Sequence, residues 1–226
     1  MRRVFPLEAY VILWIFGIAF GVVEGAVVVY LRALNAIEGG SLFPLVEFFV
    51  GGQGLLVVEL VREGATLALL LLVAWLATEV GFYRLLAFLL VFGVWDLAYY
   101  AALRVFLGWP PSLFTYDVLF LIPTVWVAPV ICPVLVSLTL IGLTSVYFLV
   151  ARSRLVEGPP LWQWPLLAAG VGLMLYAFLN NAPYYLAGGE PPRFSWGWFF
   201  SGYVLATVTA VSFLVNYSRR SRRRFG

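Results

Sequence analysis

The sequence predicts an all-α integral membrane protein, a bundle of about six transmembrane helices with interfacial or re-entrant segments on the outer side. The chain is 63% hydrophobic and only 11% charged, and its mean hydropathy of +0.99 is too high for a soluble domain. Its apolar residues fall in runs of about 20 or more, the length that a helix needs to cross the hydrocarbon core. We treat the whole chain, 1–226, as a single transmembrane domain.

Six apolar runs account for the predicted helices, at 7–31, 54–78, 83–107, 124–151, 161–181 and 196–217. The first run is too long for a removable signal peptide and lacks a small-residue cleavage pattern, so we count it as a span. Gly17, Gly21 and Gly25 recur at every fourth position in this run. Such a ridge of small residues lets a second helix approach closely.

Two connections on the predicted outer side are too long and too apolar to be simple turns. Residues 33–54 place glycine pairs around an apolar core with Pro44, which is typical of a segment that lies in the interface or dips back into it. Residues 108–133 carry five prolines, which predict a short interfacial or re-entrant piece leading into a kinked fourth helix. Both connections are candidates for a lid over an outward-facing site.

The arginines predict the orientation of the bundle. With six spans the two termini share one side, and that side holds ten of the fourteen basic residues. The positive-inside rule therefore predicts a multi-pass protein of the cell membrane with both termini in the cytoplasm. We interpret the basic tail, 218–226, as a topology anchor that contacts acidic lipid headgroups, and we expect no nucleic-acid partner.

Missing residue types exclude several classes of membrane protein. The chain has no histidine, so we expect no haem and no zinc site. All fourteen basic residues are arginine, which excludes a retinal Schiff base and a lysine nucleophile. The single cysteine, Cys132, precludes an internal disulfide and is interpreted as a packing residue.

Charged residues within the second run form one polar stripe. Glu59, Arg62, Glu63 and Thr66 follow one another at steps of three and four, so they share a face of one helix. Their spacing predicts that Arg62 pairs with Glu59 and leaves Glu63 free. Because charges inside a membrane are expensive, such a stripe indicates a site, an ion path or a proton relay.

The first and third runs add two more carboxylates. Asp96, Tyr100 and Arg104 share a stripe with Tyr99 adjacent, and Glu24 stands beside the glycine ridge. With a rise of about 1.5 Å per residue, all four carboxylates come out in the outer half of the membrane. We therefore predict that they converge on one pocket.

The predicted pocket needs a positive partner. If the four carboxylates are ionised and Arg62 stands among them, three negative charges remain, which protons or a bound cation must neutralise. Glu24, Glu63 and Asp96 are the predicted ligands of a hard divalent cation, Mg²⁺ or Mn²⁺, if one is bound. The predicted catalytic residues are these three carboxylates with Tyr99 and Tyr100, and the predicted substrate-binding residues are Arg62, Glu59, Asp117 and Asn181.

Three functions fit this pattern. The first is an intramembrane enzyme that acts on a lipid or lipid-linked substrate entering from the outer leaflet. The second is a small transporter coupled to protons or cations. The third is an accessory or scaffold subunit of a larger membrane complex. Membrane lipids are the expected partners in each case, together with other subunits in the third.

Overall fold

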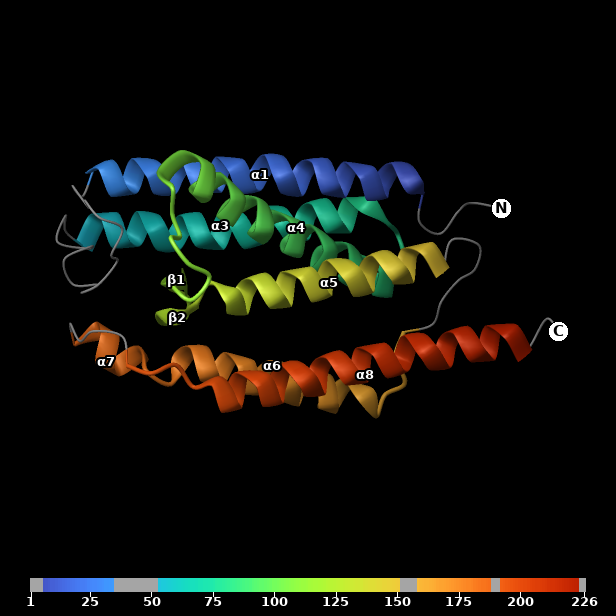
Figure 1. Ribbon diagram of the computed structural model, residues 1–226. Helices are drawn as coiled ribbons and strands as arrows, with labels where there is room; N and C mark the ends of the chain where they lie inside the picture. The colour runs from blue at the N-terminus through green and yellow to red at the C-terminus, as the bar shows by residue number, and fades with distance from the viewer. Residues whose placement is uncertain (1–5, 35–52, 151–157, 188–191, 224–226) are drawn as a thin grey trace.

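The computed structural model describes residues 6–34, 53–150, 158–187 and 192–223. Its elements are α1 Leu7–Leu34, α3 Gln53–Ala77, α4 Gly81–Leu107, β1 Tyr116–Phe120, β2 Trp126–Pro129, α5 Ile131–Val150, α6 Gln163–Leu179, α7 Ala182–Leu186 and α8 Trp196–Arg223. The long helices run roughly along one axis (Figure 1). The start of α1 and the end of α8 lie at one end of the bundle, and the two strands and α7 lie toward the other.

The helical membrane architecture is confirmed, although the count of six spans is not. Within the described residues, five segments are long and apolar enough to cross a membrane: 7–33, 81–107, 131–148, 163–186 and 196–215. The remaining long helix, α3, carries the Glu59, Arg62 and Glu63 stripe and is not among the five. It nevertheless lies along the bundle beside α1 and α4.

The connection at 108–133 was predicted as a short interfacial or re-entrant piece leading into a kinked fourth helix. It contains an antiparallel hairpin in which Tyr116 pairs with Pro129 and Asp117 with Ala128. The fourth helix therefore begins at Ile131 and not at 124. Pro133 falls in its first turn, where a missing backbone donor costs nothing, so no kink is needed. The other predicted lid, 33–54, falls almost entirely outside the described residues.

Helices α1, α3, α4 and α5 share one apolar core, and α6 and α8 pack mainly against each other. The first core contains fully buried side chains such as Leu13, Leu70 and Leu90. A second core joins α6 and α8 to the hairpin through residues such as Ala128 and Phe199. The hairpin therefore connects the two groups of helices at one end of the bundle.

The glycine ridge of α1 packs against α4, as its spacing predicts. A Cβ atom at Gly21 would lie 2.5 Å from the carbonyl oxygen of Trp95 and 2.7 Å from the Ala98 Cβ. A second close approach, which the sequence analysis missed, joins α6 and α8 at Gly170 and Gly202. Close backbone contact of this kind holds membrane helices together where the hydrophobic effect does not.

Gly21→Ala is expected to destabilise the protein by about 1–3 kcal/mol, because the obstructing atoms belong to the α4 backbone and can move only with the helix. The free energy of unfolding in an SDS titration measures the effect. Gly64→Ala is the matched control, since a Cβ there meets nothing within 4 Å. That control should be neutral or stabilising by up to about 1 kcal/mol. Equal stability of the two variants would contradict the packing argument.

Candidate functional site

A cavity of about 560 Å³ lies between the two groups of helices. It extends from the hairpin toward Gln163 at the start of α6, so it follows the long axis of the bundle. Most of its wall is leucine, phenylalanine and other apolar side chains. Its polar end, beside the hairpin, is lined by Glu24, Arg32, Glu59, Arg62, Glu63, Asp96, Tyr99, Tyr100 and Asp117.

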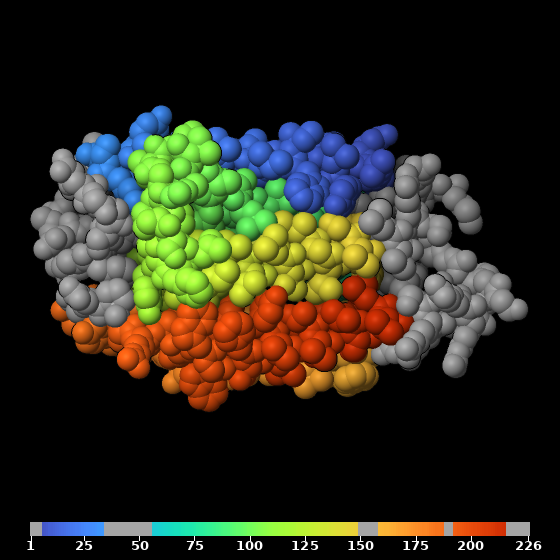
Figure 2. Space-filling view, viewed as in Figure 1, coloured from blue at the N-terminus to red at the C-terminus, as the bar shows by residue number. Residues whose placement is uncertain are grey.

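The cavity is closed on one side and accessible on another. On the face shown in Figure 2, α5 and α8 lie side by side and the hairpin region crosses one end of the bundle. On α6, however, Val171 and Trp164 line the cavity while remaining 46% and 39% exposed. The α6 wall of the cavity is therefore accessible at these two residues.

Arg62 is the centre of an ion-pair triad at the polar end. It donates to both carboxyl oxygens of Glu59, through Nε at 2.9 Å and through a second nitrogen. It also pairs with Glu24, whose other oxygen accepts a hydrogen bond from the Thr66 hydroxyl at 3.3 Å. The predicted pair of Arg62 with Glu59 is confirmed, and Glu24 joins it from α1. This triad links α1 to α3 across the cavity wall.

Glu63 is not free, contrary to the prediction. Both of its carboxyl oxygens accept the backbone N–H of Leu121, at 3.0 and 2.9 Å. Leu121 directly follows β1, so this carboxylate ties α3 to the turn of the hairpin. The sequence prediction failed here because the partner is a backbone group 58 residues away, which carries no signal in residue type.

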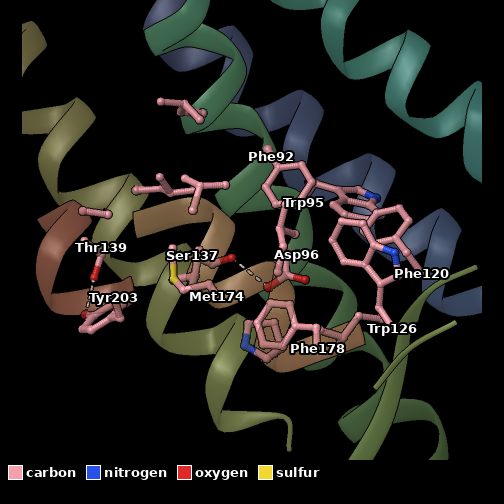
Figure 3. Close-up of a pocket in the computed structure, with 18 of the residues that line it drawn as sticks. Phe92, Trp95, Asp96, Phe120, Trp126, Ser137, Thr139, Met174, Phe178 and Tyr203 are labelled. Carbon is pink, nitrogen blue, oxygen red and sulfur yellow. Dashed lines mark hydrogen bonds between the residues drawn. The ribbon is translucent and has the colours of Figure 1, made fainter. Parts of the chain in front are cut away.

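Asp96 lies where the polar end meets the apolar wall. Its side chain is directed toward α5, and its Oδ2 accepts a hydrogen bond from the Ser137 hydroxyl at 2.8 Å (Figure 3). Its Oδ1 has no hydrogen-bond partner among the described residues. Aromatic side chains surround this carboxyl group, among them Phe92, Trp95 and Phe178.

Asp117 enters the polar end from β1. The Tyr100 hydroxyl donates to its Oδ2 at 2.9 Å, and the backbone N–H of Val118 provides a second hydrogen bond. Burial raises the pKa of the Asp117 carboxyl to about 6, although the Tyr100 hydrogen bond and the charge of Arg32 partly oppose the increase. This carboxyl group therefore takes up a proton more readily than an exposed aspartate does.

Tyr99, on α4, lines the polar end of the cavity with these groups. Its ring stacks on Trp95, with centroids 6.4 Å apart, and it interacts electrostatically with Arg32, Arg62 and Asp96. Its hydroxyl has no hydrogen-bond partner within the described part of the chain. It is therefore a donor that a bound molecule can use.

Two residues singled out from the sequence lie outside the cavity wall. Asn181 sits at the break between α6 and α7, where its carbonyl accepts the N–H groups of Tyr184 and Tyr185. Arg104, on the predicted stripe of α4, is exposed and donates to the carbonyl oxygens of Gly108 and Pro110. Both positions close the ends of helices.

The three predicted metal ligands line one cavity but hold different partners. Glu24 bonds to Arg62, Glu63 to the hairpin backbone and Asp96 to Ser137. Within the described residues, no three acidic or cysteine side chains are grouped as ligands of a metal ion. A divalent-cation site built from these carboxylates stays a prediction.

Several side chains of the cavity were missed in the sequence analysis. Arg32 was counted only among the arginines of the predicted outer side, although it lies eight residues after Glu24 and so on the same face of α1. That spacing was a usable signal. Ser137 and the Thr139–Tyr203 hydrogen bond, 2.6 Å long, come from α5 and α8. Single hydroxyl groups in apolar runs are too common to identify a site.

The fold and its buried charged residues define an integral membrane protein whose helices enclose a cavity with one polar end. Comparison of the chain with protein-family models, with curated proteins and with solved structures finds no match. The function must therefore be inferred from the cavity itself.

Proposed function

We propose that the protein is an intramembrane enzyme that binds one long-chain lipid in the cavity and moves a proton to or from it through Asp96. One observation carries the proposal: an elongated apolar cavity of about 560 Å³ meets a buried carboxyl group at its polar end. The volume falls within the range of small-molecule sites, about 300–1,000 Å³. The apolar length suits a hydrocarbon chain.

Asp96 is the best-placed acid or base among the predicted catalytic residues. Glu24 and Glu63 already hold structural partners, whereas Asp96 keeps one carboxyl oxygen without a partner among the described residues. Ser137 fixes the orientation of the carboxyl group by its hydrogen bond to Oδ2. Tyr99 supplies a neighbouring hydroxyl that can orient the substrate. A buried carboxyl group in an apolar site is a common general acid or base.

The apolar wall favours a lipid substrate over a path for protons or cations. Away from the polar end, the lining is dominated by residues such as Leu143 and Phe213. Thr144, one of the polar residues there, donates to the Leu140 carbonyl of its own helix. An ion path needs successive polar groups, whereas a lipid chain needs none.

The positive-inside rule favours an orientation with the polar end toward the external side. The start of α1 and the end of α8 lie at the end of the bundle opposite the hairpin, and the arginine count assigns that end to the cytoplasm. A lipid of the outer leaflet would then reach the cavity through its accessible α6 wall. Its headgroup would lie near the hairpin and its chain would extend toward the cytoplasmic end.

Native mass spectrometry of the purified protein tests lipid occupancy. We expect one bound lipid per chain, and we expect Ala210→Phe to remove it, because Ala210 lines the cavity and the larger ring fills it. Val204→Phe is the matched control on the same helix, since Val204 is 54% exposed and lies outside the cavity lining. Equal lipid occupancy in the Ala210→Phe variant would contradict the proposal.

A further inference from the structure

Arg32 is a buried cation that makes no hydrogen bond to the residues that the structure describes. It lies in the last turn of α1, is 6% exposed and lines the polar end of the cavity. Its guanidinium carbon lies 4.4 Å from the centroid of the Trp109 ring. Its Nε is buried without an acceptor among the described residues. A buried donor left unpaired costs about 1–3 kcal/mol, so a molecule that supplies an acceptor would be bound favourably.

The other arginine of the cavity, Arg62, already has partners for its donors and its charge. Arg62 donates to Glu59 and Glu24, so its charge is compensated and its donors are occupied. Arg32 makes no ion pair within the described residues. Of the two arginines, Arg32 is therefore the one that can receive a ligand. This differs from the sequence analysis, which assigned substrate binding to Arg62.

The cavity has more carboxylates than arginines, which disfavours an anion. The immediate surroundings of Arg32 nevertheless suit one. The carboxylate that interacts with it is Asp117, which already accepts hydrogen bonds from Tyr100 and Val118. Burial raises the pKa of this carboxyl to about 6, so it can take up a proton when an anion approaches. The Tyr99 hydroxyl, which interacts electrostatically with Arg32, offers a second donor.

We infer that Arg32 and Tyr99 bind the oxyanionic headgroup, a phosphate or a carboxylate, of the lipid whose chain occupies the cavity. The inference rests on the proposed lipid-binding function and adds the class of substrate. The planar guanidinium group matches the geometry of both oxyanions and binds them through paired hydrogen bonds. The Trp109 ring contacts the guanidinium group from one side through a cation–π interaction.

This assignment also indicates where on the lipid the reaction takes place. Tyr99 interacts electrostatically with both Arg32 and Asp96, and all three side chains line the cavity. A headgroup bound at Arg32 therefore leaves the first atoms of the chain beside the Asp96 carboxyl group. The substrate class that follows is a single-chain anionic lipid that reacts close to its headgroup.

Binding of three amphiphiles with the same chain tests the inference. Dodecyl phosphate, dodecanoate and dodecyltrimethylammonium are titrated into the protein in nanodiscs, and tryptophan fluorescence reports binding near Trp109. We expect at least one of the two anions to bind more tightly than the cation. Preference between the phosphate and the carboxylate identifies the headgroup. Tighter binding of the cation would overturn the inference, because the excess of carboxylates would then control recognition.

Variants of Arg32 provide the second arm of the test. Arg32→Gln should weaken binding of the preferred anion by about 10- to 100-fold and leave cation binding unchanged or stronger, since it removes charged hydrogen bonds. Arg32→Lys should bind with intermediate affinity because it keeps the charge without the planar geometry. Arg193→Gln, at an exposed arginine outside the cavity, should have no effect. Unchanged anion affinity in Arg32→Gln would overturn the inference.

The same titrations separate failure of the inference from failure of the proposed function. If Ala210→Phe abolishes binding of all three amphiphiles while Arg32→Gln has no effect, the cavity binds lipid chains and only the headgroup assignment is wrong. If Ala210→Phe binds them as the unmodified protein does, the chains do not enter the cavity. The second result would contradict both proposals.

Discussion

Asp96→Asn is expected to reduce lipid conversion by about 10²- to 10⁴-fold, the usual contribution of a general acid or base. The amide cannot take up or release the proton, but its oxygen can still accept the Ser137 hydrogen bond. The fold and the lipid occupancy should therefore be retained. This combination of lost turnover and preserved binding separates a catalytic role from a structural one.

The measurement uses total membrane lipid from the source cells, because the substrate is identified by the reaction itself. Purified protein in nanodiscs is incubated with the lipid extract, and chromatography with mass spectrometry follows species whose amounts change with time. Glu8→Gln, the same carboxyl-to-amide change at an exposed residue outside the cavity, is the matched control. Conversion by Asp96→Asn at the unmodified rate would contradict the catalytic role of Asp96.

Ser137 is a positioning residue in this scheme. Ser137→Ala removes the hydrogen bond that orients the Asp96 carboxyl group, worth about 1 kcal/mol, so the loss of conversion should be much smaller than for Asp96→Asn. The pH profile of conversion should shift, because the hydroxyl hydrogen bond stabilises the ionised form of the carboxyl group. A purely structural role would lower the amount of folded protein without moving that profile.

The helices could be predicted from sequence because membrane solvation acts on each one separately. A run long enough to cross the hydrocarbon core, such as 83–107, has few alternatives to a helix, and α4 begins within two residues of that prediction. The start of α5 could not be placed in this way. The apolar run continues back through β2, and the strand residues are as apolar as those of the helix.

The hairpin could not be predicted, because its segment carries five prolines, which are typical of irregular backbone. Prolines in this segment exclude a continuous helix but do not exclude a short two-stranded sheet. Pro129 lies at the end of β2, and Tyr116 opposite it begins β1. The hairpin could be recognised only from long-range pairing, which a single sequence does not reveal.

The sequence predicts which residues line the candidate site better than it predicts which partners they bind. Glu24, Glu63 and Asp96 line one cavity. Each is a carboxyl group in an apolar helix, and contact with lipid is unfavourable for such a group, so it faces a polar site inside the bundle. Their individual partners depend on how three helices rotate about their axes. A rotation by one residue position moves a side chain by about 100°, which composition and spacing do not fix.

The same reasoning gives the largest expected effect on stability. Arg62→Gln should destabilise the protein by about 3 kcal/mol, because Glu24 and Glu59 lose the cation that compensates them in a mostly buried site. The side chain of Arg62 is 22% exposed, so water reaches the site in part and the cost stays at the low end for a broken buried ion pair. The free energy of unfolding in an SDS titration measures this cost.

Removal of the two carboxylates tests whether uncompensated charge causes the loss of stability. If uncompensated charge is the reason for the loss, the triple variant Arg62→Gln, Glu24→Gln, Glu59→Gln should recover most of the stability, because replacing a complete buried charge network is often close to neutral. Arg104→Gln, at an exposed arginine with no carboxylate partner among the described residues, should cost less than about 1 kcal/mol. If the triple variant is as unstable as Arg62→Gln alone, the triad acts through its shape and hydrogen bonds, and its charge balance is not what holds α1 against α3.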